Sequence, residues 1–118
     1  MAYIDSYLIP LDPKQKDAYL KMAETFRTFA KEQGALAYFE ALSDDVPRGE
    51  HTDFYRAVAA EEGEEVIASY VVWKDKAARD AAMKAMHEDE RFTGETPETM
   101  PFDGKRMIWG GFEPIIEL

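Results

Sequence analysis

Two acidic residues of this chain stand beside tyrosines at the two-residue spacing of a β-strand. Asp5 precedes Tyr7 and Glu40 follows Tyr38, so each carboxylate would share a sheet face with a phenol. A carboxylate buried among apolar side chains can serve as a general base, and a tyrosine hydroxyl can donate a hydrogen bond to a substrate oxygen. These four residues are therefore candidate catalytic groups.

Three further residues are candidate ligand-binding side chains. Tyr70 supplies a hydroxyl, Trp109 an indole ring, and Arg106, next to Lys105, a cation in a mostly acidic chain. The structural alternative is that the two carboxylates are solvated at strand ends, or paired within the chain or across a dimer with Arg56 or Arg106. We favour this alternative because structural ion pairs outnumber catalytic ones.

The sequence contains no recognisable motif for a metal site or a cofactor site. The two histidines, His51 and His87, are not arranged in a metal-binding spacing such as HExxH. The chain has no cysteine, which excludes disulfides, thiolate metal sites and cysteine nucleophiles. It also lacks the glycine-rich motifs of nucleotide-binding loops and of a serine nucleophile elbow. We predict neither a metal nor a cofactor.

Turn residues and apolar spacing predict four strands and three helices. Asp12 is a suitable N-cap, Pro13 suits the first helical position, and Gly34 suits the residue after the helix end. The segment 53–60 fits a short helix better than a strand. The predicted strands are Tyr3–Ile9, stopped by Pro10, then Ala35–Leu42, Glu65–Trp73 and Arg106–Glu113, and the predicted helices are 13–33, 53–60 and Lys76–His87, with a loop over about 89–102.

This order repeats strand–helix–strand twice, which is typical of an α+β ferredoxin-like βαββαβ sandwich. We expect one domain over residues 1–118, with both long helices on one face of a four-stranded antiparallel sheet. The residues expected beneath the helices are small or smooth: Ile4, Leu8, Ala37, Phe39 and Ala41.

The strand 65–73 is apolar in both of its alternating sets, so both faces of the sheet are expected to be buried. The helices of one chain cover only one face, and an open apolar face promotes aggregation. We therefore predict a homodimer in which the sheets of two copies face each other as a dimeric α/β barrel.

A long segment, RFTGETPETMPFDGKR, precedes the last strand and contains a tight turn at Asp103-Gly104. Connections of this length are often lids or binding loops. Met100, Pro101 and Phe102 either close over a pocket or wrap around the partner subunit, and we favour the partner.

The charge of the chain argues against several partners. The 24 Asp and Glu residues outnumber the 14 Lys and Arg residues, giving −10 at pH 7. Nucleic acid and anionic membranes select clustered cations instead. The longest apolar stretch, Val66–Trp73, is too short to span a bilayer, and the first residues lack the basic region of a secretory signal. We expect a cytoplasmic protein.

Three segments, Met100–Glu113, Asp53–Ala57 and Glu61–Glu64, resemble the bacterial YbaA-like family of uncharacterised proteins, and the likeness covers essentially the whole chain. The resemblance implies the dimeric α/β-barrel superfamily, which includes small monooxygenases, haem-degrading enzymes and ligand-sensing modules. It implies a fold more than a function. No catalytic residue carries over, and Trp109 alone does not make the Asn–Trp–His set of the haem-degrading relatives.

These observations leave three functions. We rank first a homodimer that binds a small molecule. The alternative is a small cofactor-independent enzyme, monooxygenase-like or isomerase-like, with a carboxylate–tyrosine pocket between sheet and helices. A purely structural homodimer with a filled interior comes third.

Overall fold

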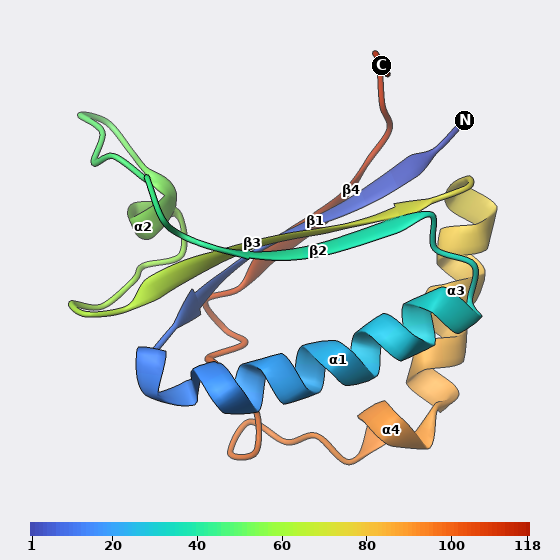
Figure 1. Ribbon diagram of the computed structural model, residues 1–118, viewed down its shortest axis with the longest axis horizontal. Coiled ribbons are helices and arrows are strands. Elements are labelled where there is room, and N and C mark those ends of the chain that lie inside the picture. The colour runs from blue at the N-terminus through green and yellow to red at the C-terminus, as the bar shows by residue number, and fades with distance from the viewer.

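A computed structural model describes residues 1–118. Four strands form one antiparallel sheet in the order β2-β3-β1-β4, and the two long helices, α1 and α3, cover one face of it (Figure 1). This is the predicted ferredoxin-like arrangement. The elements are β1 (Tyr3–Leu11), the 3-10 turn η1 (Pro13–Gln15), α1 (Lys16–Glu32), β2 (Ala37–Leu42), α2 (Phe54–Ala57), β3 (Glu65–Trp73), α3 (Lys76–Glu88), α4 (Glu90–Thr93) and β4 (Ile108–Phe112).

Local signals define the first helix as predicted. The Asp12 side chain accepts a hydrogen bond from the Lys14 backbone N–H at 3.0 Å, and Pro13 opens the turn that leads into α1. Gly34 follows the helix with a φ of +86°, a conformation that costs glycine little. Tyr19 and Phe29 are among the residues that α1 buries. None of the helices is both long enough and apolar enough to cross a membrane.

Several bounds differ from the prediction: β2 begins at Ala37 rather than Ala35, α2 spans 54–57 rather than 53–60, and β4 spans 108–112 rather than 106–113. Strand β1 continues through Pro10 to Leu11, whereas the sequence suggested a stop at Pro10. Pairing with β4 ends at Leu8, so that side of β1 is an edge at Pro10, where a residue without an N–H is tolerated. The expected loop after α3 contains the short helix α4, whose N-cap Asp89 accepts a hydrogen bond from the Arg91 backbone N–H.

The sheet faces carry the predicted sets of residues, but the helices cover the other set. Asp5 pairs across the strands with Val71, and Tyr7 with Ser69, which in turn pairs with Glu40. This larger, more polar set faces α1 and α3. The smooth set was wrongly expected there and lies on the opposite face: Ile4, Leu8, Ala37, Phe39 and Ala41.

The face opposite the long helices is exposed within one chain, as expected if the helices of one subunit cover only one face of the sheet. Phe39 is 52% exposed and Phe112 is 59% exposed. The short helix α2 lies on this side of the sheet (Figure 1), where Phe54 helps to line an apolar hollow of about 410 Å³ together with Tyr70 and Phe112. Exposed apolar side chains on this face therefore come from β2, β3 and β4.

Glycine at position 111 makes room for a polar contact between the sheet and α3. Arg79 of α3 donates a hydrogen bond to Asp5 at 3.0 Å and lies over the Tyr3 ring, with its guanidinium carbon 4.9 Å from the ring centroid. A Cβ at Gly111 would collide with the Arg79 guanidinium and the Tyr3 hydroxyl. The absence of a side chain at residue 111 therefore leaves room for the Arg79–Asp5 contact beside the paired strands β1 and β4.

Gly111→Ala is expected to lower the free energy of unfolding by about 1–3 kcal/mol, because the methyl group displaces Arg79 from Asp5. Urea denaturation measures the change. Gly110→Ala is the control, since its Cβ would meet only the Phe112 ring at an ordinary 3.6 Å. Equal losses in the two variants would contradict this account of position 111.

Candidate functional site

A cavity of about 320 Å³ lies between the sheet and the helices. Its walls come from α1, the three strands β1, β2 and β3, the end of α3, α4 and the segment before β4. Most of the lining is aromatic or thioether: Tyr7, Tyr19, Phe26, Tyr38, Phe92, Phe102, Met22, Met86, Met100 and Met107. An apolar enclosure with a few polar groups is the usual construction of a small-molecule site.

Glu40 is the polar centre of this cavity. Its carboxylate accepts hydrogen bonds from the Tyr19 hydroxyl at 2.5 Å, from the Ser69 hydroxyl at 3.1 Å and from the Tyr38 hydroxyl. The donors belong to α1, β3 and β2, so the cluster ties three elements together. Tyr7 lines the same cavity, and its hydroxyl forms no hydrogen bond within the chain.

The environment keeps these phenols protonated. Burial, followed by the charges of Asp5 and Glu40, raises the pKa of Tyr7 to about 12. Burial and the Glu40 carboxylate also raise the pKa of Tyr19 and that of Tyr38 far above the ordinary tyrosine range. At neutral pH all three are hydrogen-bond donors, and the hydroxyl of Tyr7 is the one left for a ligand.

Asp5 does not join this cluster. Its side chain is 1% exposed, accepts hydrogen bonds from Trp73 Nε1 and Arg79 Nε, each at 3.0 Å, and does not line the cavity. The structure therefore separates the two carboxylates that the sequence grouped. For Asp5 the ion-pair interpretation describes the geometry, but the partner is Arg79 rather than Arg56 or Arg106.

The three candidate ligand-binding residues also lie outside the cavity. Arg106 is held by Glu64 at 2.6 Å and Asp103 at 3.0 Å. Tyr70 is on the exposed sheet face, with its ring 4.9 Å from that of Phe39. Trp109 stacks on Tyr7 from the β4 side, with the ring centroids 6.2 Å apart, and is itself 55% exposed.

The segment before β4 covers the cavity of its own subunit, although wrapping of a partner was the favoured expectation. Met100 and Phe102 line the cavity, and the Phe102 ring meets Tyr19 edge-on at 5.8 Å. The turn at Asp103-Gly104 forms as predicted, with a backbone hydrogen bond from Arg106 to Asp103.

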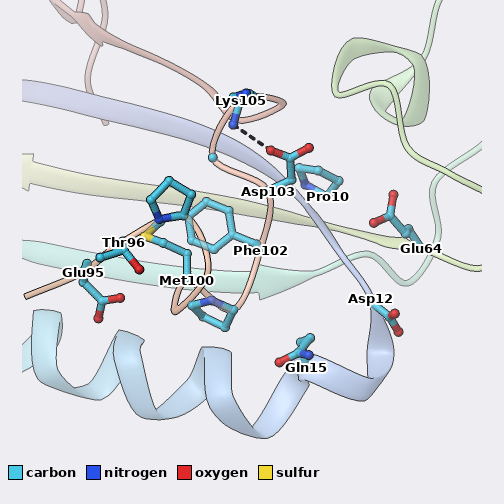
Figure 2. A pocket seen from close by; sticks show the side chains of 13 residues that line it. Pro10, Asp12, Gln15, Glu64, Glu95, Thr96, Met100, Phe102, Asp103 and Lys105 are labelled. Carbon is cyan, nitrogen blue, oxygen red and sulfur yellow. Dashed lines mark hydrogen bonds between the residues drawn. The ribbon is translucent and has the colours of Figure 1, made fainter.

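Beside the cavity lies a larger, more polar hollow of about 590 Å³, here called the outer hollow. It runs beneath residues 95–105 to the start of α1 (Figure 2). It shares Glu95, Met100 and Phe102 with the cavity, so the two spaces adjoin. The charged side chains that line it are Asp12, Glu64, Glu95, Asp103 and Lys105.

Sequence reasoning missed several residues of the cavity. Tyr19, Phe26 and Ser69 line the cavity but are not among the candidates that the sequence suggests. Their contact with the cavity depends on which part of the sheet α1 crosses, which periodicity does not reveal. No three His, Asp or Glu side chains are placed together as metal ligands, and neither His51 nor His87 lines the cavity.

The fold and the cavity together define an α+β ferredoxin-like protein with a mainly apolar cavity between its sheet and its helices. The chain belongs to a family described as "Protein of unknown function (DUF1428)", whose model matches residues 2–104. It is 48% identical over 117 residues to "Uncharacterized protein YbaA" of Escherichia coli strain K12, an alignment that covers 99% of both chains. The predicted YbaA-like membership is confirmed.

Solved structures share the fold at low sequence identity. A dimeric ferredoxin-like protein from an uncultured marine organism superposes with a TM-score of 0.62 at 13% identity, covering 99% of this chain and 98% of that one. A structure described as an antibiotic biosynthesis monooxygenase gives a TM-score of 0.52 at 18% identity, covering 98% of this chain and all of that one. At these identities the likeness concerns the fold alone.

The raised pKa values of these tyrosines predict that the folded protein loses stability at alkaline pH. Tyr7 keeps its proton up to about pH 12 when folded, whereas an unfolded tyrosine loses it near pH 10. The stabilisation is therefore complete below about pH 10 and is lost as the pH rises towards about 12. Urea denaturation at several pH values is expected to show this fall, with a shallower slope for Tyr7→Phe. An unchanged slope would contradict the shift at Tyr7.

Proposed function

We propose that the protein is a homodimer that binds a small organic molecule in the cavity between the sheet and helices of each subunit. The supporting observation is the Glu40 cluster, because a carboxylate, three donor hydroxyls and the free Tyr7 hydroxyl converge within a mainly apolar enclosure. Such convergent polar groups orient a ligand, while the apolar walls supply most of its affinity.

The exposed sheet face supports the dimer. Phe39, Tyr70, Ile108 and Phe112 are each more than two-fifths exposed on one side of one sheet. A second copy of the same face would bury these apolar side chains in an isologous interface. The related fold from a marine organism is itself described as dimeric.

A second candidate is a small cofactor-independent enzyme, monooxygenase-like or isomerase-like. The observation that favours it is the adjacency of Glu40 and the phenols in one cavity, with the Tyr7 hydroxyl free to contact a substrate oxygen. One structure of similar fold is described as an antibiotic biosynthesis monooxygenase. In this candidate Glu40 is the base and Asp5 has only a structural role.

The dimer is tested by placing a charge on the sheet face. Phe39→Asp is expected to convert dimer to monomer, because each interface would then bury two unpaired carboxylates. Sedimentation velocity gives the state directly. Leu20→Asp introduces the same charge at a 47% exposed position of α1 and is expected to leave the dimer intact. A monomeric wild-type protein, or a dimer that survives Phe39→Asp, would refute this interface.

The ligand is tested by native mass spectrometry of protein purified from its own host. We expect a bound mass on the wild type that is absent from Met22→Trp, because the indole fills the cavity. Met83→Trp is the matched control, since Met83 is also partly buried but lies outside the cavity. A wild-type protein with no added mass, or an equal added mass on both variants, would count against the proposed site.

A further inference from the structure

The carboxylate at the centre of the cavity has no cationic partner. None of the ion pairs of the chain includes Glu40, although they engage the carboxylates of Asp5, Asp53, Glu64 and Asp89. Its hydrogen bonds all come from neutral hydroxyls, two of them tyrosines. A partly buried carboxylate that lacks a counter-charge is stabilised when a cation binds beside it.

Arg91, the one cationic side chain on the cavity wall, already forms ion pairs with two carboxylates. Arg91 lies 2.7 Å from Glu32 and 2.7 Å from Asp89, and neither carboxylate lines the cavity. Glu95, by contrast, lines the cavity and has only the Thr99 hydroxyl as a partner, at 3.3 Å. The charge that remains available to a ligand inside the cavity is therefore negative.

We propose that the ligand is an organic ammonium ion, with one N–H group on Glu40 and its apolar body among the aromatic and methionine side chains. This inference rests on the proposed binding function and names its ligand class. Glu40 accepts three hydrogen bonds, which leaves acceptor capacity for one charge-assisted hydrogen bond from an ammonium group. The rings that line the cavity add attraction, because aromatic faces stabilise a nearby cation.

A ligand of the opposite charge does not fit the same wall. An anion bound in the cavity would lie against the negative charge of Glu40. The three hydroxyls that bond Glu40 are already committed, so only the Tyr7 hydroxyl would remain to donate a hydrogen bond to the anion. A neutral alcohol would gain the apolar contacts without the charge-assisted hydrogen bond. We therefore expect affinity for the cavity to be highest for an ammonium head group, lower for a hydroxyl and lowest for a carboxylate.

The outer hollow favours the approach of a cation. Four carboxylates and one lysine line it, and it shares Glu95 with the cavity (Figure 2). Glu64 and Asp103 are partly neutralised by Arg106, and Asp12 caps a backbone N–H, yet the rim keeps an excess of negative charge. The formal charge of −10 on the whole chain acts in the same direction.

Three probes with the same phenyl body test the inference: 2-phenylethylamine, 2-phenylethanol and 3-phenylpropanoate. Isothermal titration calorimetry with the full chain is expected to show the amine binding about tenfold or more tightly than the alcohol, and the carboxylate weakest. Glu40→Gln, which keeps the shape of the side chain, is expected to abolish the preference for the amine. Glu24→Gln removes an exposed carboxylate of α1 and is expected to change nothing.

The outcomes separate this inference from the function on which it rests. Equal binding of amine and alcohol by the wild type overturns the ammonium ligand while leaving a working cavity, and that comparison needs no variant to fold. An amine preference that persists in folded Glu40→Gln also overturns it. If none of the three probes binds, the proposed binding function fails together with the inference.

Discussion

Two carboxylates on the helix-covered face of the sheet constrain how the helices pack. A buried carboxylate needs hydrogen-bond donors, and the two find theirs on different helices. Asp5 takes Arg79 from α3 together with the Trp73 indole, which forms a closed ion pair. Glu40 takes Tyr19 from α1 and hydroxyls from two strands, which leaves space beside it. One carboxylate therefore anchors the fold, and the other faces a cavity.

Much of this fold follows from local signals. Asp12 and Gly34 delimit the first helix, and strict alternation correctly groups Tyr7 with Asp5 and Tyr38 with Glu40. Alternation does not tell which face meets the helices. The size of the side chains suggested the smooth set, but the helices cover the bulky polar set because their own side chains satisfy its carboxylates.

The site was only half predictable for the same reason. Glu40, Tyr38 and Tyr7 stand out in the sequence, and all three line the cavity. Arg79 lies 74 residues from Asp5, and Tyr19 lies 21 residues from Glu40, so no local pattern connects them. The methionines of the wall are scattered through α1, α3 and the segment before β4. Only the packing of these elements brings them together.

The two tryptophans lie in opposite surroundings. Trp73 is 3% exposed and bonded to Asp5, while Trp109 is 55% exposed and stacked on a phenol of the cavity wall. The protein therefore carries two intrinsic fluorophores in different environments, one buried and one exposed. The Trp73 indole senses the interior around Asp5, and the Trp109 indole senses the β4 edge beside Tyr7, without an added label.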